Sequence, residues 1–125
     1  GPIKNVGRLK WLPRSIMILT LQHSILEQDP MPLLETFPNL QSLELIAAYI
    51  GHSFCCTAKG FPELELLRFR SLYGLDWHME EGAMPMLKGV GIYKCPGLKC
   101  PERINRVRKL KETEKRLLPY ERTWA

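Results

Sequence analysis

Apolar residues recur along the chain in four copies of one pattern. In each copy an aliphatic residue is followed three and five positions later by two further apolar residues. The first positions of the four copies are Ile16, Leu40, Leu64 and Leu87, which are 24, 24 and 23 residues apart. Each copy is preceded by a proline, at Pro13, Pro38, Pro62 and Pro85. Such a regular period predicts a solenoid, because one short unit cannot bury its own apolar row and must stack on its neighbours.

Each unit predicts one short strand whose alternate side chains face the core. The expected strands lie near residues 16–21, 40–45, 64–69 and 87–92. Their period falls in the range of leucine-rich repeats, so the expected fold is a leucine-rich-repeat solenoid. Its short parallel strands should form the concave face, and irregular loops with short helical turns should form the back. Asp29-Pro30 predicts a turn and then one helical turn over Met31 to Thr36.

The two ends of the chain carry weaker patterns. Residues 1–2 resemble the remnant of a cleaved expression tag, and the repeats are expected to span 3–112. Residues 3–12 resemble the tail of a preceding repeat, so the chain is expected to be a C-terminal fragment. Such a fragment could self-associate through its exposed repeat edges.

The segment after Pro101 has two interpretations. It can be a degenerate fifth repeat with a strand at 107–112, followed by a polar cap or tail over 113–125. Alternatively, a helix begins at Pro101, a residue favoured in the first helical turn. We favour the last repeat, because a terminal repeat needs a polar outer surface.

Charge changes the picture only at the C-terminal end. The net charge is +5, and residues 99–125 carry nine basic and four acidic side chains. A basic segment can contact nucleic acid or acidic lipid, and a repeat scaffold with such a tail is the alternative function considered. Interleaved glutamates favour a solvated end segment instead, so nucleic acid is not the expected partner.

The remaining chemistry of the sequence is sparse. Four cysteines, Cys55, Cys56, Cys95 and Cys100, lack the spacing of a zinc site or of a dense disulfide framework, so reduced thiols are expected. The three histidines form no recognisable catalytic motif, and no phosphate-binding loop occurs. We therefore expect no enzyme activity, no metal, no cofactor, no ATP binding and no small-molecule substrate. No apolar run is long enough to span a membrane.

The candidate binding surface is the concave sheet face. Strand alternation turns one set of side chains outward, among them Glu44, Ile46, Leu66, Arg68, Arg70 and Tyr93. Arginine and tyrosine are enriched at binding hot spots, and outward apolar residues add contact area. In the competing interpretation these charges are solvated or paired across strands, as Glu44 with Arg68 would be. Gly89 and Gly91 lie within a predicted strand and should open room on this face.

The third and fourth units carry a family resemblance. It is carried by the leucine-containing run from Leu67 to Trp77, by the run E-E-G-A-M-P-M-L at 80–87, and by the segment from Val90 to Pro101 with its Cys-Pro pair. This spacing resembles the C-terminal repeats of plant intracellular nucleotide-binding leucine-rich-repeat immune receptors of the coiled-coil type. Residues 29–45 resemble the preceding unit, whereas Cys100 and Arg103 depart from the pattern.

The resemblance implies a cytoplasmic receptor. In such receptors the repeats help to sense a pathogen effector and hold a nucleotide-binding domain inactive. The implied partners are therefore proteins, namely an effector or the receptor's own nucleotide-binding domain.

Overall fold

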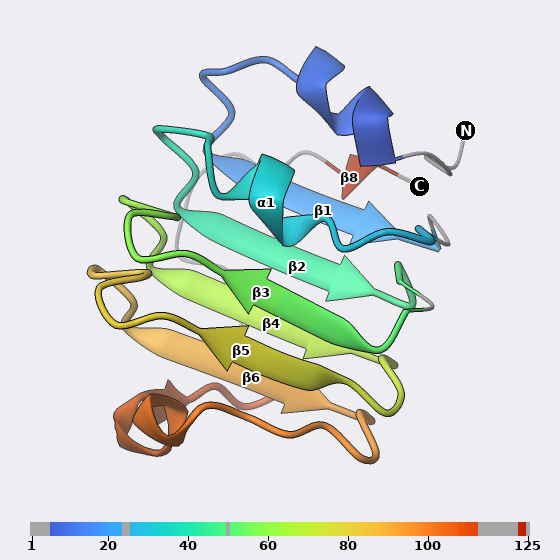
Figure 1. Ribbon diagram of the computed structural model, residues 1–125, viewed down its shortest axis with the longest axis vertical. Coiled ribbons are helices and arrows are strands. Elements are labelled where there is room, and N and C mark those ends of the chain that lie inside the picture. Colours follow the sequence, from blue (N-terminus) through green and yellow to red (C-terminus); the bar gives the residue numbers. More distant parts are fainter. Residues whose placement is uncertain (1–5, 24–25, 50, 113–122, 125) are drawn as a thin grey trace.

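The four apolar units form four parallel strands stacked in chain order, which confirms the leucine-rich-repeat solenoid. The computed structural model describes residues 6–23, 26–49, 51–112 and 123–124. In Figure 1 the strands of the main sheet lie one below another along the long axis. They are β1 (Ile18–Gln22), β2 (Ser42–Ile46), β4 (Leu66–Arg70) and β6 (Gly89–Tyr93).

The strands begin two residues later than the apolar pattern predicted. The first leucine of a unit, such as Leu40, is fully buried but belongs to the turn that leads into the strand. Both Gln41 and Ser42 donate their backbone N–H groups to the Met17 carbonyl, at 2.7 and 3.0 Å. Regular pairing therefore starts only at Ser42, which lies opposite Ile18. The predicted range 40–45 was correspondingly early, as were the other three.

Each of the four repeat strands β1, β2, β4 and β6 is followed by a residue with left-handed backbone geometry. These residues are His23, Ala47, Ser71 and Lys94, with φ values of 55°, 47°, 56° and 53°. Three of them continue the strand ladder by donating a backbone N–H to the next strand; the His23 N–H, for example, lies 2.9 Å from the Ile46 carbonyl oxygen. The turn that leaves the sheet is therefore repeated with the same period as the leucines.

The back of the solenoid contains a second sheet that the sequence did not reveal. Helix α1 (Met31–Leu34) lies within the predicted helical turn. The two later back segments, which were expected to be irregular, contain the parallel strands β3 (Ser53–Cys56) and β5 (Asp76–Met79). In these strands Phe54, Cys56 and Trp77 face the core and are buried, whereas Cys55 and His78 are exposed.

The core fills the space between the two sheets. It consists of the repeat leucines, together with Leu9 of the 3-10 helix η1 (Val6–Trp11). Aromatic rings connect the two sheets. The ring centroid of Phe54 in β3 lies 5.4 Å from that of Phe69 in β4, and the Phe69 centroid lies 5.1 Å from that of Trp77 in β5. No helix among the described residues has the length and apolar character needed to cross a membrane.

Two very short strands form the edges of the main sheet. After the 3-10 helix η2 (Glu102–Arg106), strand β7 (Arg108–Lys109) pairs in parallel with β6. Residues 101–112 are therefore not one helix, and their strand is shorter than the predicted 107–112. At the opposite edge β8 (Thr123–Trp124) pairs in parallel with β1. The predicted cap at 113–125 lies outside the described residues except for β8.

Candidate protein-interaction face

The outward side chains of the main sheet form straight rows because the strands are in register. We call this side, which faces away from the core, the outer face. One row crosses the carboxyl ends of the strands, and its members are Gln22, Ile46, Arg70 and Tyr93. The next row inward contains Thr20, Glu44, Arg68 and Gly91, and the third contains Ile18, Ser42, Leu66 and Gly89. The predicted ridge of charged and aromatic residues thus occupies two neighbouring rows.

The six predicted site residues differ in exposure. Glu44, Leu66 and Arg68 retain only 7, 7 and 5% of their surface and are buried. The residues Ile46, Arg70 and Tyr93 of the end row remain partly exposed. Glu44 lies directly opposite Arg68, as the cross-strand interpretation required. The surface available to a partner is therefore centred on the end row.

Arg70 and Tyr93 form one unit on the outer face. The Arg70 Cζ atom lies 5.0 Å from the centroid of the Tyr93 ring, a cation–π geometry. The Tyr93 side chain folds back over Gly91, where an added Cβ would overlap the tyrosine hydroxyl and ring. Gly91 therefore allows the ring to lie along the strand, and the ring in turn supports the guanidinium group.

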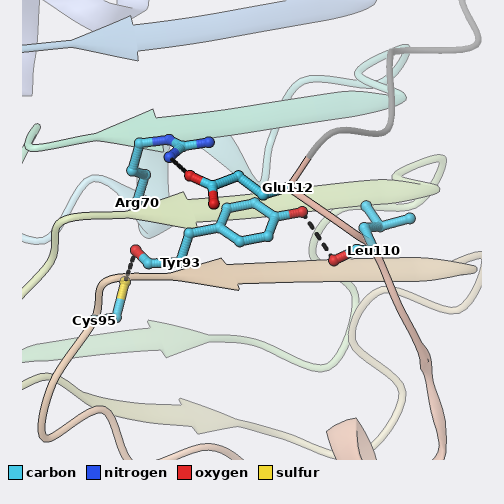
Figure 2. A network of polar contacts seen from close by, with 5 residues as sticks. All are labelled: Arg70, Tyr93, Cys95, Leu110 and Glu112. Carbon is cyan, nitrogen blue, oxygen red and sulfur yellow. Dashed lines mark hydrogen bonds and ion pairs between the residues drawn. The ribbon is translucent and has the colours of Figure 1, made fainter.

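The residues that follow β7 contact this unit, as Figure 2 shows. The Tyr93 hydroxyl donates to the Leu110 carbonyl oxygen at 3.0 Å. Arg70 Nη1 donates to Glu112 Oε1 in a charge-assisted contact. A Cβ added to Gly89 would lie 2.8 Å from Leu110 Cδ2 and 3.2 Å from Leu66 Cδ2. The two glycines thus open room on the sheet face, as expected, and Leu110 and Tyr93 occupy it.

The Arg70–Glu112 contact shifts the titration of the glutamate. The Arg70 hydrogen bond, and then the Arg70 charge, lower the pKa of the Glu112 carboxyl below its ordinary value of 4.5. Because the folded-state pKa is the lower one, this contact stabilises the folded chain above the unfolded-state pKa. Its contribution is lost as the pH falls through the folded-state pKa.

Two buried donors on the outer face lack hydrogen-bond partners. Within the part of the chain that the structure describes, Arg68 Nη1 and Ser42 Oγ are buried and make no hydrogen bond. Buried polar groups are nearly always hydrogen-bonded, so each such group requires an explanation. Both belong to the two inner rows, and both would be satisfied by an acceptor such as a peptide carbonyl.

Part of the positive charge near the C-terminal end is used within the fold. Arg103 donates to the Ala83 and Met84 carbonyls, and Lys109 donates to the Ile104 and Val107 carbonyls. Backbone carbonyls near these cations occupy donors that a phosphate would otherwise engage. Across residues 6–23, 26–49, 51–112 and 123–124, no three His, Cys, Asp or Glu side chains group to hold a metal ion.

Sequence reasoning found Arg70 and Tyr93 but missed Leu110 and Glu112. The sequence pattern placed both only within the predicted strand at 107–112. The signal that could have located them is the pair of outward glycines on β6, Gly89 and Gly91. Sheet positions without side chains leave space that another segment can fill. Neither residue has a repeat pattern of its own that would have indicated its contact.

The stacked strands, their buried leucine rows and the face described above define a leucine-rich-repeat protein. In sequence the chain is similar to the Disease susceptibility protein LOV1 of Arabidopsis thaliana, with 40% identity over 70% of this chain. It is similar also to the Putative disease resistance protein At1g59780 and the Disease resistance RPP8-like protein 3 of the same plant. These are 38% identical over 80% and 81% of this chain.

The similarities identify the chain as a leucine-rich-repeat segment related to plant disease-resistance proteins. It spans only 10, 11 and 12% of the length of these three relatives. No family model matches the sequence. No solved structure matches the chain.

Proposed function

We propose that the chain is a protein-interaction repeat module of a cytoplasmic plant disease-resistance receptor. In this proposal the module takes part in sensing a pathogen effector and in holding the receptor's nucleotide-binding domain inactive. The names of its relatives support the disease-resistance setting, and the stacked repeats support a binding role. The proposal assigns the chain no catalytic step and no cofactor.

The observation that carries the proposal is the end row of the outer face. Ile46, Arg70 and Tyr93 lie on adjacent strands in register and remain partly exposed. They place an aliphatic, a cationic and an aromatic side chain next to one another on a rigid sheet. This combination is typical of binding hot spots, where arginine and tyrosine contribute most of the energy.

The experiment compares proteins captured from plant lysate by the unchanged chain and by a face variant. The variant carries Ile46→Ser and Arg70→Glu, two partly exposed residues whose replacement leaves the leucine rows intact. Arg68 is avoided because it is buried, so its reversal would disturb the fold. Capture is read by mass spectrometry at low and near-physiological salt.

The matched control is Lys59→Glu, a charge reversal of the same sign at an exposed residue after β3. Proteins bound through the face should be retained by the unchanged chain and by the control, and lost from the face variant by about tenfold or more. An identical set of proteins on all three chains would remove the outer face as the interface. Retention of nucleic acid alone, falling steeply with salt, would favour the basic segment instead.

A further inference from the structure

Three contacts on the outer face together form a recognition site for an extended peptide. The first is apolar: Leu110 is buried to 6% exposure and its Cδ2 occupies the space beside Gly89 and Leu66. Neighbouring strand β4 carries a leucine and an arginine at the positions where β6 carries two glycines. The space that Leu110 occupies therefore exists because β6 has glycines at these two positions.

The second contact holds the peptide backbone. The Leu110 N–H donates to the Val90 carbonyl at 2.8 Å, and the Leu110 carbonyl accepts from the Tyr93 hydroxyl at 3.0 Å. Both backbone groups of the leucine are thereby satisfied. Backbone hydrogen bonds of this kind give affinity without depending on the side chains of the bound segment.

The third contact reads an acidic side chain. Glu112 lies two residues beyond Leu110, and its side chain reaches the same face of the sheet. Its carboxylate meets Arg70, whose guanidinium rests on the Tyr93 ring. Arginine is suited to carboxylates because its donors are planar and permanently charged. The pair is still partly open to solvent, with side-chain exposures of 27 and 51%, so it can exchange.

From these contacts we propose that the outer face over β4 and β6 binds extended protein segments carrying an apolar residue followed two positions later by an acidic residue. Residues 110–112 occupy this site as an internal ligand. A partner protein with the same spacing competes with them for Gly89, Tyr93 and Arg70. This inference rests on the proposed function and names the partner chemistry at the same face.

The internal ligand makes a definite competition test possible. The probe is a fluorescein-labelled peptide with the sequence of residues 107–112, Val-Arg-Lys-Leu-Lys-Glu. Binding is measured by fluorescence polarisation on the whole chain and on a Leu110→Ser, Glu112→Gln double variant. An attached ligand competes at millimolar effective concentration, so the double variant should bind the peptide at least about tenfold more tightly.

Charge reversal at Arg70 tests whether this residue binds the acidic side chain of the peptide. Adding Arg70→Glu to the double variant should reduce affinity for the peptide by about tenfold or more, whereas adding Lys59→Glu should change it less than about twofold. A second peptide with lysine in place of its glutamate should bind the Arg70→Glu chain better than the original peptide does. Far-ultraviolet circular dichroism checks that each variant is folded, and Glu112→Gln alone serves if loss of Leu110 unfolds the chain.

Three results would overturn the inference. They are equal binding by the unchanged chain and the double variant, affinity that does not depend on the peptide glutamate, and competition by a single-stranded oligonucleotide but not by unlabelled peptide. Competition by the oligonucleotide alone would indicate that the outer face binds phosphate groups. If no peptide binds while the lysate capture still depends on Ile46 and Arg70, the inference fails and the proposed function stands.

Discussion

A strained backbone position follows each of the four repeat strands β1, β2, β4 and β6. His23, Ala47, Ser71 and Lys94 all have φ values near +50°, although none is glycine. For a residue with a side chain this conformation costs about 1–2 kcal/mol. The solenoid keeps the turn because the N–H groups of His23, Ala47 and Ser71 themselves continue the ladder. The strain is therefore a local cost of stacking the units in register.

Replacing His23 by glycine should stabilise the chain. The His23 side chain is exposed, so its removal sacrifices no core packing. Relief of strain should exceed the added flexibility of the unfolded chain, giving a net gain of about 0.5–1 kcal/mol in the free energy of unfolding. Urea denaturation measures the change. Gln28→Gly, at an exposed loop residue without positive φ, should instead lose a similar amount; a loss at both positions would refute the strain argument.

The adjacent thiols of β3 differ in environment. Cys56 faces the core, and burial raises its pKa to about 12, whereas the neighbouring Cys55 is exposed. At pH 8.5 almost none of Cys56 is thiolate, and the thiolate is the form that reacts. Alkylation by iodoacetamide should therefore be about 100-fold slower at Cys56 than at Cys55, measured by peptide mass spectrometry. In denaturing urea the two rates should converge, and equal rates in the folded chain would contradict the burial.

At the scale of the element, β3 is braced by two carboxylates from the preceding unit. Asp29 accepts the Cys55 N–H at 2.8 Å and the Met31 N–H of helix α1 at 2.9 Å. Glu35 accepts the Thr57 N–H at 2.9 Å and also the Thr57 hydroxyl. These bonds satisfy backbone donors beside an edge strand, so they replace the neighbour that the two-stranded sheet lacks on that side.

Loss of the Glu35 brace should destabilise the back of the solenoid. Glu35→Ala removes the carboxylate acceptor of the part-buried Thr57 N–H bond, which should lower the free energy of unfolding by about 1–3 kcal/mol. Glu63→Ala, at an exposed residue, should change it by less than about 0.5 kcal/mol. Thermal unfolding by circular dichroism compares the two. Equal effects would show that the Glu35 hydrogen bonds add nothing to stability.

A strand of this chain could be predicted from the sequence only where its apolar residues repeat with a regular period. The leucine pattern located all four main strands, because buried rows repeat with a fixed period. It misplaced their starts, since the first aliphatic residue of each unit lies just before the strand and packs against the core as a strand residue would. Strands β3 and β5 share only a short apolar alternation, with Phe54 and Cys56 in one and Trp77 and Met79 in the other. Two positions are too few to predict a strand, and the pairing depends on the stacking of the units, which places Phe54 beside Trp77.

The candidate site was predictable in part for the same reason. The alternation of side chains along a strand identified Arg70 and Tyr93 as outward-facing, because it depends only on positions within one strand. It could not show that Leu110 and Glu112 would meet them, since that contact joins residues far apart in sequence. The burial of Glu44 and Arg68 could not be predicted either, because side-chain alternation only distinguishes inward from outward positions.

At the scale of the whole molecule, the C-terminal strand β8 closes the sheet beside β1. Thr20 lies opposite Thr123, and Leu21 lies opposite Trp124. Residues from the beginning and the end of the chain are thus neighbours in one sheet. Among the described residues, the main sheet has six strands in the order β7-β6-β4-β2-β1-β8.

Thr123→Pro should detach this edge without altering the rest of the sheet. Proline removes one ladder donor and is poorly tolerated in a paired strand. Amide hydrogen exchange in Thr20–Gln22 should become faster, whereas exchange in β6 should not change. Thr123→Val keeps the backbone N–H and should preserve the exchange pattern of the unchanged chain. If β1 exchanges at the same rate in both variants, β8 does not protect it.

Both edges of the main sheet are strands of only two residues, β7 and β8. A long bare edge is a template on which a second chain can add strands, and repeated addition produces fibres. Here an incoming chain meets at most two residues of ladder at either end. The short edge strands therefore offer a second chain little template for strand addition and so little start for a fibre.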